Sequence, residues 1–142
     1  MSIYYHKESV SVSFDEDKTS NWLENSIEEL GFKCGETSII FCNDEYLKNI
    51  NQKYLNHDYY TDIITFDYTV NDKISGDLFI SVDRLKENAK QNNEKFIREL
   101  YRVIIHGILH LCGFNDKTEE QKTLIRAKEN EFLSSIDWKT VV

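Results

Sequence analysis

Two histidines, a glycine and an aspartate stand at a spacing that suits a metal ion. In the segment HGILHLCGFND, His106 and His110 are four residues apart, and Gly113 and Asp116 follow at intervals of three. On an α-helix, residues four apart project from the same face, so the two imidazoles can point to one place. Gly113 can adopt the left-handed conformation that ends a helix, and the turn would bring Asp116 in from another side. We therefore predict a metal site with His106, His110 and Asp116 as ligands and a fourth position open, as in catalytic zinc sites.

The alternative for these histidines is a purely structural role. A histidine on an apolar helix is usually a hydrogen-bonded core residue, and pairs at this spacing also occur by chance. The glycine and the third ligand type in register favour the metal site over that alternative.

The spacing H-x-x-x-H-x-x-G-x-x-D is also that of the metzincin peptidases. Those enzymes need a glutamate directly after the first histidine as the general base that activates water. Here that position is Gly107. Loss of a general base typically costs about 10²–10⁴-fold in rate, so a zinc peptidase is only the second hypothesis.

A long helix must carry the two histidines. Apolar residues recur at helical spacing from 93 to 112. The segment TEEQ, from Thr118 to Gln121, has the form of a capping box and predicts the start of a last helix. Upstream, the alternation of polar and apolar residues predicts a strand at 8–14. Apolar residues at helical spacing then predict a helix that ends at Gly31. Further strands are predicted at 37–42, 61–69 and 76–82, the last two antiparallel, with helices beginning near Asn43 or Asp44 and at Asp83. Residues 1–142 are thus expected to form one α+β domain: a small, mixed four-stranded sheet packed with about five helices, around a zincin-like central metal-binding helix.

Composition narrows the function classes. The net charge of −8 argues against indiscriminate nucleic-acid binding, although it does not exclude a local basic patch. No apolar run approaches the length of a membrane span, and the first residues do not have the form of a signal peptide, so we expect a cytoplasmic protein without membrane contact. Three cysteines in apolar surroundings suit reduced thiols better than a disulfide framework.

The chain resembles the YbeY family of bacterial metal-dependent single-strand endoribonucleases. HGILHLCGFND is similar to the family signature H-G-x-L-H-L-x-G-aromatic-D-H. The segment INQKYLNHDYYTDIITF is similar to L-N-x-x-aromatic followed by T-D-V-L-S-F, and GDLFIS to a G-D-I strand. The resemblance implies a bound zinc ion and a substrate in ribosomal RNA on the small subunit, with roles in late 16S 3′-end maturation and ribosome quality control. The oligomeric state stays open.

Two departures from the family pattern affect the site. The family motif usually ends in D-H, whereas this chain has Asn115 and Asp116, so the third ligand should be a carboxylate. Two imidazoles and one carboxylate leave a Zn²⁺ site less positive than three imidazoles would, and this harder ligand set admits Mn or Fe(II) more readily. Zinc, one ion per chain, remains the first choice. Where the family usually has an arginine that suits phosphate, this chain has Leu55; nearby Lys53 or His57 are weak substitutes.

Basic and aromatic residues suggest how RNA could be held. Lys95, Arg98 and Arg102 form a stripe along the helix that leads to His106, and RNA could follow it toward the metal. An equally weighted alternative is a solvated face balanced by neighbouring glutamates. Three aromatic residues could stack on unpaired bases, although Phe66 is expected in the core; they are Tyr59, Tyr60 and Phe66. The leading hypothesis is thus a metal-dependent endoribonuclease, ahead of a peptidase and of a non-catalytic RNA-binding protein with a structural metal closed by a distant histidine such as His6 or His57.

Overall fold

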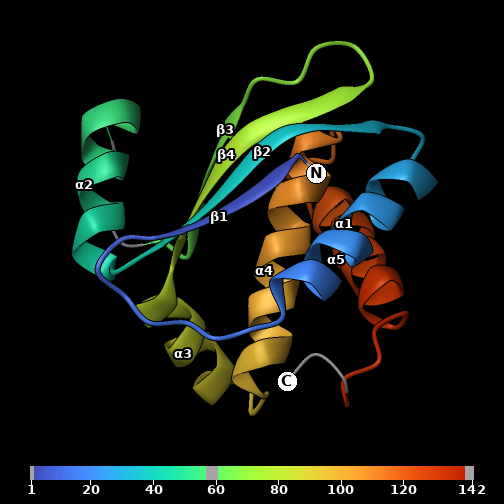
Figure 1. The fold of residues 1–142 in the computed structure, drawn as a ribbon. Coiled ribbons are helices and arrows are strands. Elements are labelled where there is room, and N and C mark those ends of the chain that lie inside the picture. The colour runs from blue at the N-terminus through green and yellow to red at the C-terminus, as the bar shows by residue number, and fades with distance from the viewer. Residues whose placement is uncertain (1, 57–60, 140–142) are drawn as a thin grey trace.

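A mixed sheet of four strands forms the centre of the computed structural model, which describes residues 2–56 and 61–139 (Figure 1). The strands lie in the order β1-β2-β4-β3. The β1–β2 and β2–β4 pairs are parallel, and β3 runs antiparallel to β4 at the edge. This confirms the predicted mixed four-stranded sheet and the antiparallel pair. The strands are β1 (Ile3–Lys7), β2 (Lys33–Cys42), β3 (Ile63–Asp67) and β4 (Lys73–Ser81).

Helices cover both faces of the sheet. In the described residues there are five, as predicted, and α2 stands alone on one side of the sheet while α4, α1 and α5 lie on the other (Figure 1). α4 contacts β3, β4, α1, α3 and α5, so it is the central helix of the fold. None of these helices is long and apolar enough to cross a membrane. The helices are α1 (Glu16–Glu29), α2 (Asp44–Leu55), α3 (Val82–Gln91), α4 (Phe96–Leu111) and α5 (Glu119–Leu133).

Three of the predicted signals at helix ends are confirmed, whereas the helix expected to begin at Asp83 begins at Val82, with Ser81 as its N-cap. The Asn43 side chain accepts a hydrogen bond from the Tyr46 backbone N–H and so caps α2, while Thr118 and Gln121 form the predicted capping box of α5. Gly31 has a φ of 87°, in the left-handed region, just after α1. These local interactions fix where the helices begin and end.

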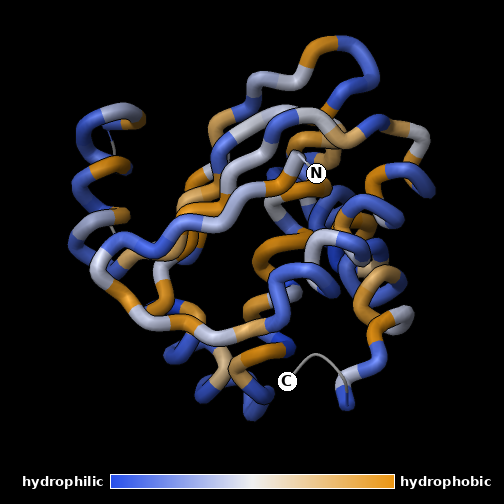
Figure 2. The backbone as a smooth tube through the Cα atoms, viewed as in Figure 1, coloured by the Kyte–Doolittle hydropathy of each residue, from blue (hydrophilic) through white to orange (hydrophobic). Residues whose placement is uncertain are grey.

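Apolar side chains fill both spaces between the sheet and its helices. The larger core joins Ile39, Phe41, Leu78 and Ile80 of the sheet to the buried face of α4. On the opposite face, a smaller cluster packs Leu47 of α2 against the sheet. Figure 2 shows the same distribution, with hydrophobic residues gathered in α4 and the strands and hydrophilic residues on the outer helices. The burial of α4 between sheet and helices fixes which of its faces remains available for chemistry.

Gly107 lets α4 lie directly against the sheet. A Cβ at this position would overlap Leu78 Cδ2 of β4 and would lie 2.8 Å from Ile63 Cδ1 of β3. A side chain at this position would therefore require Leu78 and Ile63 to repack. A glutamate at the position of the metzincin general base would thus disturb the packing of α4 on the sheet.

The predicted strand at 8–14 is wrong. The first strand is β1 (Ile3–Lys7), and the chain from residue 8 to 14 has no regular structure. The Glu8 backbone N–H makes a last sheet bond to the Phe41 carbonyl, and Ser9 then turns the chain with a φ of 57°. Val12 is nevertheless buried, and Val10 and Phe14 pack against the core. The alternation of apolar residues therefore reflected inward-pointing side chains and not strand pairing.

The Gly107 contact can be tested by substitution. Gly107→Ala should destabilise the protein, because overpacking a core typically costs about 1–3 kcal/mol, more than the ~0.5–1 kcal/mol that alanine gains over glycine in a helix. Urea unfolding would measure the loss. In a Leu78→Ala background the clashing methyl is absent, so the same change should cost less; equal costs in both backgrounds would contradict the proposed contact.

Candidate metal centre

The three predicted ligands meet at one point beside α4. His106 Nε2 and His110 Nε2 are 3.0 Å apart, and each lies 3.3 Å from Asp116 Oδ2. All three side chains are half-buried. The spacing of four residues therefore brings the two imidazoles together as predicted. Asp116 completes a nearly equilateral triangle of donor atoms, which we call the ligand triangle.

This triangle has the size and chemistry that a metal ion requires. Ligand atoms that lie ~2.0–2.1 Å from a tetrahedral Zn²⁺ stand about 3.3 Å from one another. Imidazole nitrogen and carboxylate oxygen are ordinary ligands of zinc. Within the described ranges, no fourth donor joins the group, and His6 of β1 is not part of it. His57 lies outside the described residues. The donor set fits a metal ion that is held by three protein ligands.

A tight turn after α4 delivers the aspartate. Gly113 has a φ of 94°, and its N–H donates to the His110 carbonyl while the Phe114 N–H donates to the Leu109 carbonyl. This is the Schellman arrangement, which satisfies the last carbonyls of a helix and reverses the chain. The predicted left-handed glycine is confirmed. It turns the segment before α5 back toward the histidines, and so Asp116 faces them.

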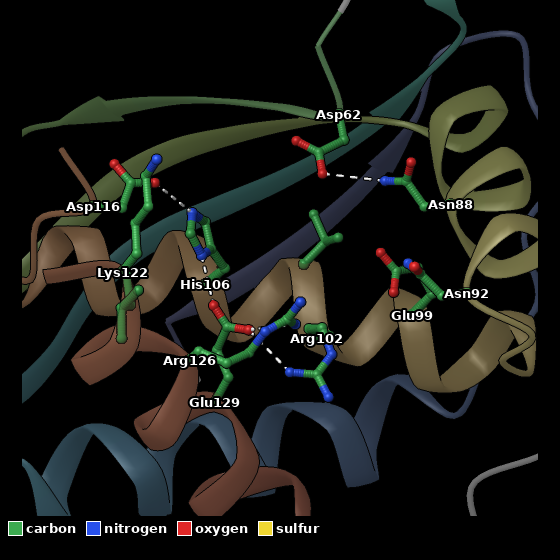
Figure 3. Close-up of a pocket in the computed structure, with 12 residues that line it drawn as sticks. Asp62, Asn88, Asn92, Glu99, Arg102, His106, Asp116, Lys122, Arg126 and Glu129 are labelled. Atoms are coloured by element: carbon green, nitrogen blue, oxygen red, sulfur yellow. Dashed lines mark hydrogen bonds and ion pairs between the residues drawn. The ribbon is translucent and has the colours of Figure 1, made fainter. Parts of the chain in front are cut away.

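Glu129 of α5 is a site residue that the sequence did not indicate. Its carboxylate is only 5% exposed; Oε2 lies 2.7 Å from His106 Nδ1, and Oε1 lies 3.0 Å from Arg102 Nη1 (Figure 3). A carboxylate on Nδ1 fixes the orientation of the ring and leaves Nε2 to face the ligand triangle. Glu129 follows His106 by more than twenty residues on another helix, so only its place on the apolar face of α5, three residues before Phe132, hinted at burial.

The surroundings of Glu129 and His106 favour the charged form of each side chain. Burial alone would raise the pKa of Glu129, but the hydrogen bond and charge of His106, with Arg102 and Arg126, outweigh it and lower that pKa. Burial alone would lower the pKa of His106, but the bond and charge of Glu129, with Asp116 and Asp62, raise it overall. Glu129 therefore remains a carboxylate that can accept the Nδ1 proton of His106.

Two pockets open on either side of the ligand triangle. One, of about 420 Å³, lies on the α5 side; it is lined by Asp62, Asn88, Asn92, Glu99, Arg102, Val103, His106, Asp116, Lys122, Ile125, Arg126 and Glu129. The other, of about 510 Å³, lies on the β3 side; it is lined by Asn51, Leu55, Thr61, Asp62, Ile63, Ile64, Thr65, Asp67, His106, His110 and Asp116. His106, Asp116 and Asp62 line both, so the two pockets adjoin at the triangle of donor atoms.

Asp62 is the second residue that the sequence did not single out. It stands just before β3, and its Oδ2 lies 3.3 Å from Asn88 Nδ2 of α3 (Figure 3). Burial raises its pKa, while the charge of His106 and the hydrogen bond of Asn88 act in the opposite direction. The resemblance of the TDIITF segment to the family pattern was the signal that could have pointed to this carboxyl group.

The three residues of the basic stripe, Lys95, Arg98 and Arg102, lie in different surroundings. Arg102 lies in the α5-side pocket on Glu129, whereas Arg98 lies 3.5 Å from Glu94 and its guanidinium stands over the Trp138 ring at 5.1 Å. Lys95 is exposed just before α4. Only Arg102 of the three reaches the pocket beside the ligand triangle. The role of the stripe in RNA binding stays a prediction.

Other residues named from the sequence fall in different places. Leu55 lines the β3-side pocket, while Lys53 is exposed and its ammonium group lies over the Tyr54 ring. Phe66 packs against the Tyr54 and Phe79 rings, as expected for a residue near the core. Tyr59 and Tyr60, like His57, lie outside the described residues.

The chain is similar to known proteins over most of its length. The family described as "Endoribonuclease YbeY" matches residues 3–137. A relative of that name from Phocaeicola vulgatus is 47% identical over 94% of this chain and 98% of its own, and one from Christiangramia forsetii is 54% identical over 78% of each chain. A Thermotoga maritima protein solved in solution superposes with a TM-score of 0.66 at 26% identity, over 93% of this chain and 87% of its own. The chain therefore belongs to the YbeY family of endoribonucleases.

Proposed function

We propose that the protein is a metal-dependent endoribonuclease in which His106, His110 and Asp116 hold one catalytic Zn²⁺, with Mn or Fe(II) as other candidates. The observation that carries the proposal is the triangle of donor atoms with edges of 3.0, 3.3 and 3.3 Å. Zn²⁺ bound there would polarise a phosphoryl oxygen and activate water for attack on phosphorus. Membership of the family supports an RNA substrate, and residues 1–142 would form one catalytic domain.

The chain's own groups position the reaction. Glu129 accepts the Nδ1 proton of His106 and keeps that imidazole in one tautomer, with Nε2 free for the ion. Arg102 holds Glu129 in place from the other side. The two pockets leave room for an RNA strand to cross the triangle, so that one phosphodiester can lie beside the open coordination position.

The substrate we propose is single-stranded ribosomal RNA. Metal-assisted cleavage needs one phosphodiester placed at the ion, and an unpaired strand can bend to bring it there. The family resemblance supports a role in late 16S 3′-end maturation and ribosome quality control on the small subunit, and therefore a cytoplasmic location. The overall negative charge of the protein accords with a selective substrate and not with general RNA binding.

The two alternative functions are less well supported. A zinc peptidase would need a general base after His106, and that position is Gly107, where a Cβ would overlap Leu78 Cδ2. A structural metal would need a fourth protein ligand, and none joins the group in the part of the chain that the structure describes.

Asp116→Asn tests the ligand set. The amide keeps the size of the carboxylate but lacks its charge, so the fold should survive while zinc affinity and RNA cleavage fall together. Zinc should raise the stability of the wild type, by about 2.7 kcal/mol at a hundredfold excess over its dissociation constant, and should do so much less in the variant. Thermal unfolding with and without zinc, metal analysis and a gel assay on single-stranded RNA would measure this. A variant that binds zinc and cuts RNA like the wild type would exclude Asp116 as a ligand.

Glu129→Gln tests the positioning of His106. Loss of a carboxylate partner of a ligating histidine typically weakens metal binding about 10–100-fold. A competition titration with a chromophoric chelator would give the zinc dissociation constant. Glu131→Gln, on an exposed carboxylate of the same helix that pairs with Lys128, is a matched control and should leave zinc affinity unchanged. Equal affinities for wild type and Glu129→Gln would show that Glu129 acts only in packing.

The basic stripe needs a test that spares Arg102, because that residue holds Glu129. Lys95→Gln with Arg98→Gln should weaken RNA binding and flatten its dependence on salt, with zinc content unchanged. Binding of a labelled single-stranded RNA at several KCl concentrations would measure the slope. An identical slope would assign these two residues to a solvated face.

A further inference from the structure

The two pockets beside the ligand triangle differ in charge. Three cations line the α5-side pocket: Arg102, Lys122 and Arg126. Among the described residues that line the β3-side pocket there is no lysine or arginine, and Leu55 and Ile63 give it apolar surface. Among the described residues, cations that could attract the phosphates of a strand are therefore found only in the α5-side pocket, which Asp62, Glu99, Asp116 and Glu129 also line.

Lys122 and Arg126 are the accessible cations of the α5-side pocket. They are four residues apart on α5, so they project from the same face, which is also the face of Glu129. Their side chains are 56% and 60% exposed, whereas Arg102 is 17% exposed. Lys122 pairs with exposed Glu119 at 3.7 Å, and Arg126 contacts Glu129 at 3.4 Å through Nη1. Such exposed or long pairs are weak, and a phosphate can replace or join them.

The carboxyl groups in the pocket restrict where a phosphate can lie. Glu129 is already matched by His106 and Arg102. Asp62 and Glu99 gather with Asn88 and Asn92 at the α3 end of the pocket, away from Lys122, which rises from α5 on the side of Asp116 (Figure 3). The acidic end repels a phosphate, so the favourable position is the α5 wall.

We propose that Lys122 and Arg126 bind the RNA backbone phosphate next to the one that is cleaved, so that the strand crosses the ligand triangle with its phosphates against α5 and its bases toward β3. The proposal rests on the RNA-cleaving function proposed above. It assigns two residues outside the ligand set and outside the α4 stripe to substrate binding, and it gives the bound strand one orientation.

The double variant Lys122→Gln/Arg126→Gln tests this assignment. Each phosphate that the protein neutralises on a single strand contributes about 0.7 to the slope of log affinity against log salt, and the pair binds one phosphate, so the slope should fall by about 0.7. Between 50 and 200 mM KCl the variant should then lose about 2.6-fold less affinity than its parent. The zinc-loaded enzyme should show a higher KM for a single-stranded RNA, with kcat within about twofold and zinc content unchanged.

The control removes the same charge elsewhere. Lys86→Gln/Lys90→Gln changes two exposed lysines of α3 that line neither pocket, and should keep the parent's salt slope. The binding arm uses fluorescence anisotropy of labelled RNA with all variants in an Asp116→Asn background, so that it does not depend on cleavage. A double variant with the parent's slope, or a control that loses as much slope, would overturn the proposal. If RNA is bound through this pair but the wild type never cuts it, the catalytic function fails while the binding site stands.

Discussion

The direct contact between α4 and the sheet at Gly107 is the constraint on which the site depends. Because no Cβ separates the helix from Leu78, the face of α4 that includes Gly107, Ile104 and Leu111 is committed to the core. The residues next to it on the helical surface are then fixed at the border between the core and the solvent. His106 and His110 occupy that border, half-buried, where a side chain is held by packing and still reaches a substrate.

Much of this arrangement could be predicted because it is local. The helical period around the histidines, the glycine that ends α4 and the capping box at Thr118 act within a few residues, and each was found in its predicted place. The prediction of a strand at 8–14 was wrong because an alternating pattern does not distinguish strand pairing from a loop whose apolar side chains point inward. β1 was missed because its tyrosines, His6 and Lys7 look polar, although the strand pairs with β2 along its whole length.

The parts of the site that could not be predicted depend on contacts distant in the sequence. Glu129 looks like one acidic residue among many on α5, and only the packing of α5 on α4 buries it against His106 and Arg102. The same packing removes Arg102 from the exposed stripe. The overall negative charge likewise conceals a pocket with three cations, because net charge reports the whole surface and not the wall of one cavity.

The order of elements along the chain has a consequence for biosynthesis. All four strands precede α4 and α5, so a growing chain exposes the apolar face of the sheet until the helix with the histidines has been made. Parallel pairing of distant strands is also slow compared with the formation of a helical hairpin. The segment from α4 to α5 thus brings both the cover for the core and the three donor atoms of the triangle. The three donor atoms can therefore meet only after the helix that covers the sheet has been made.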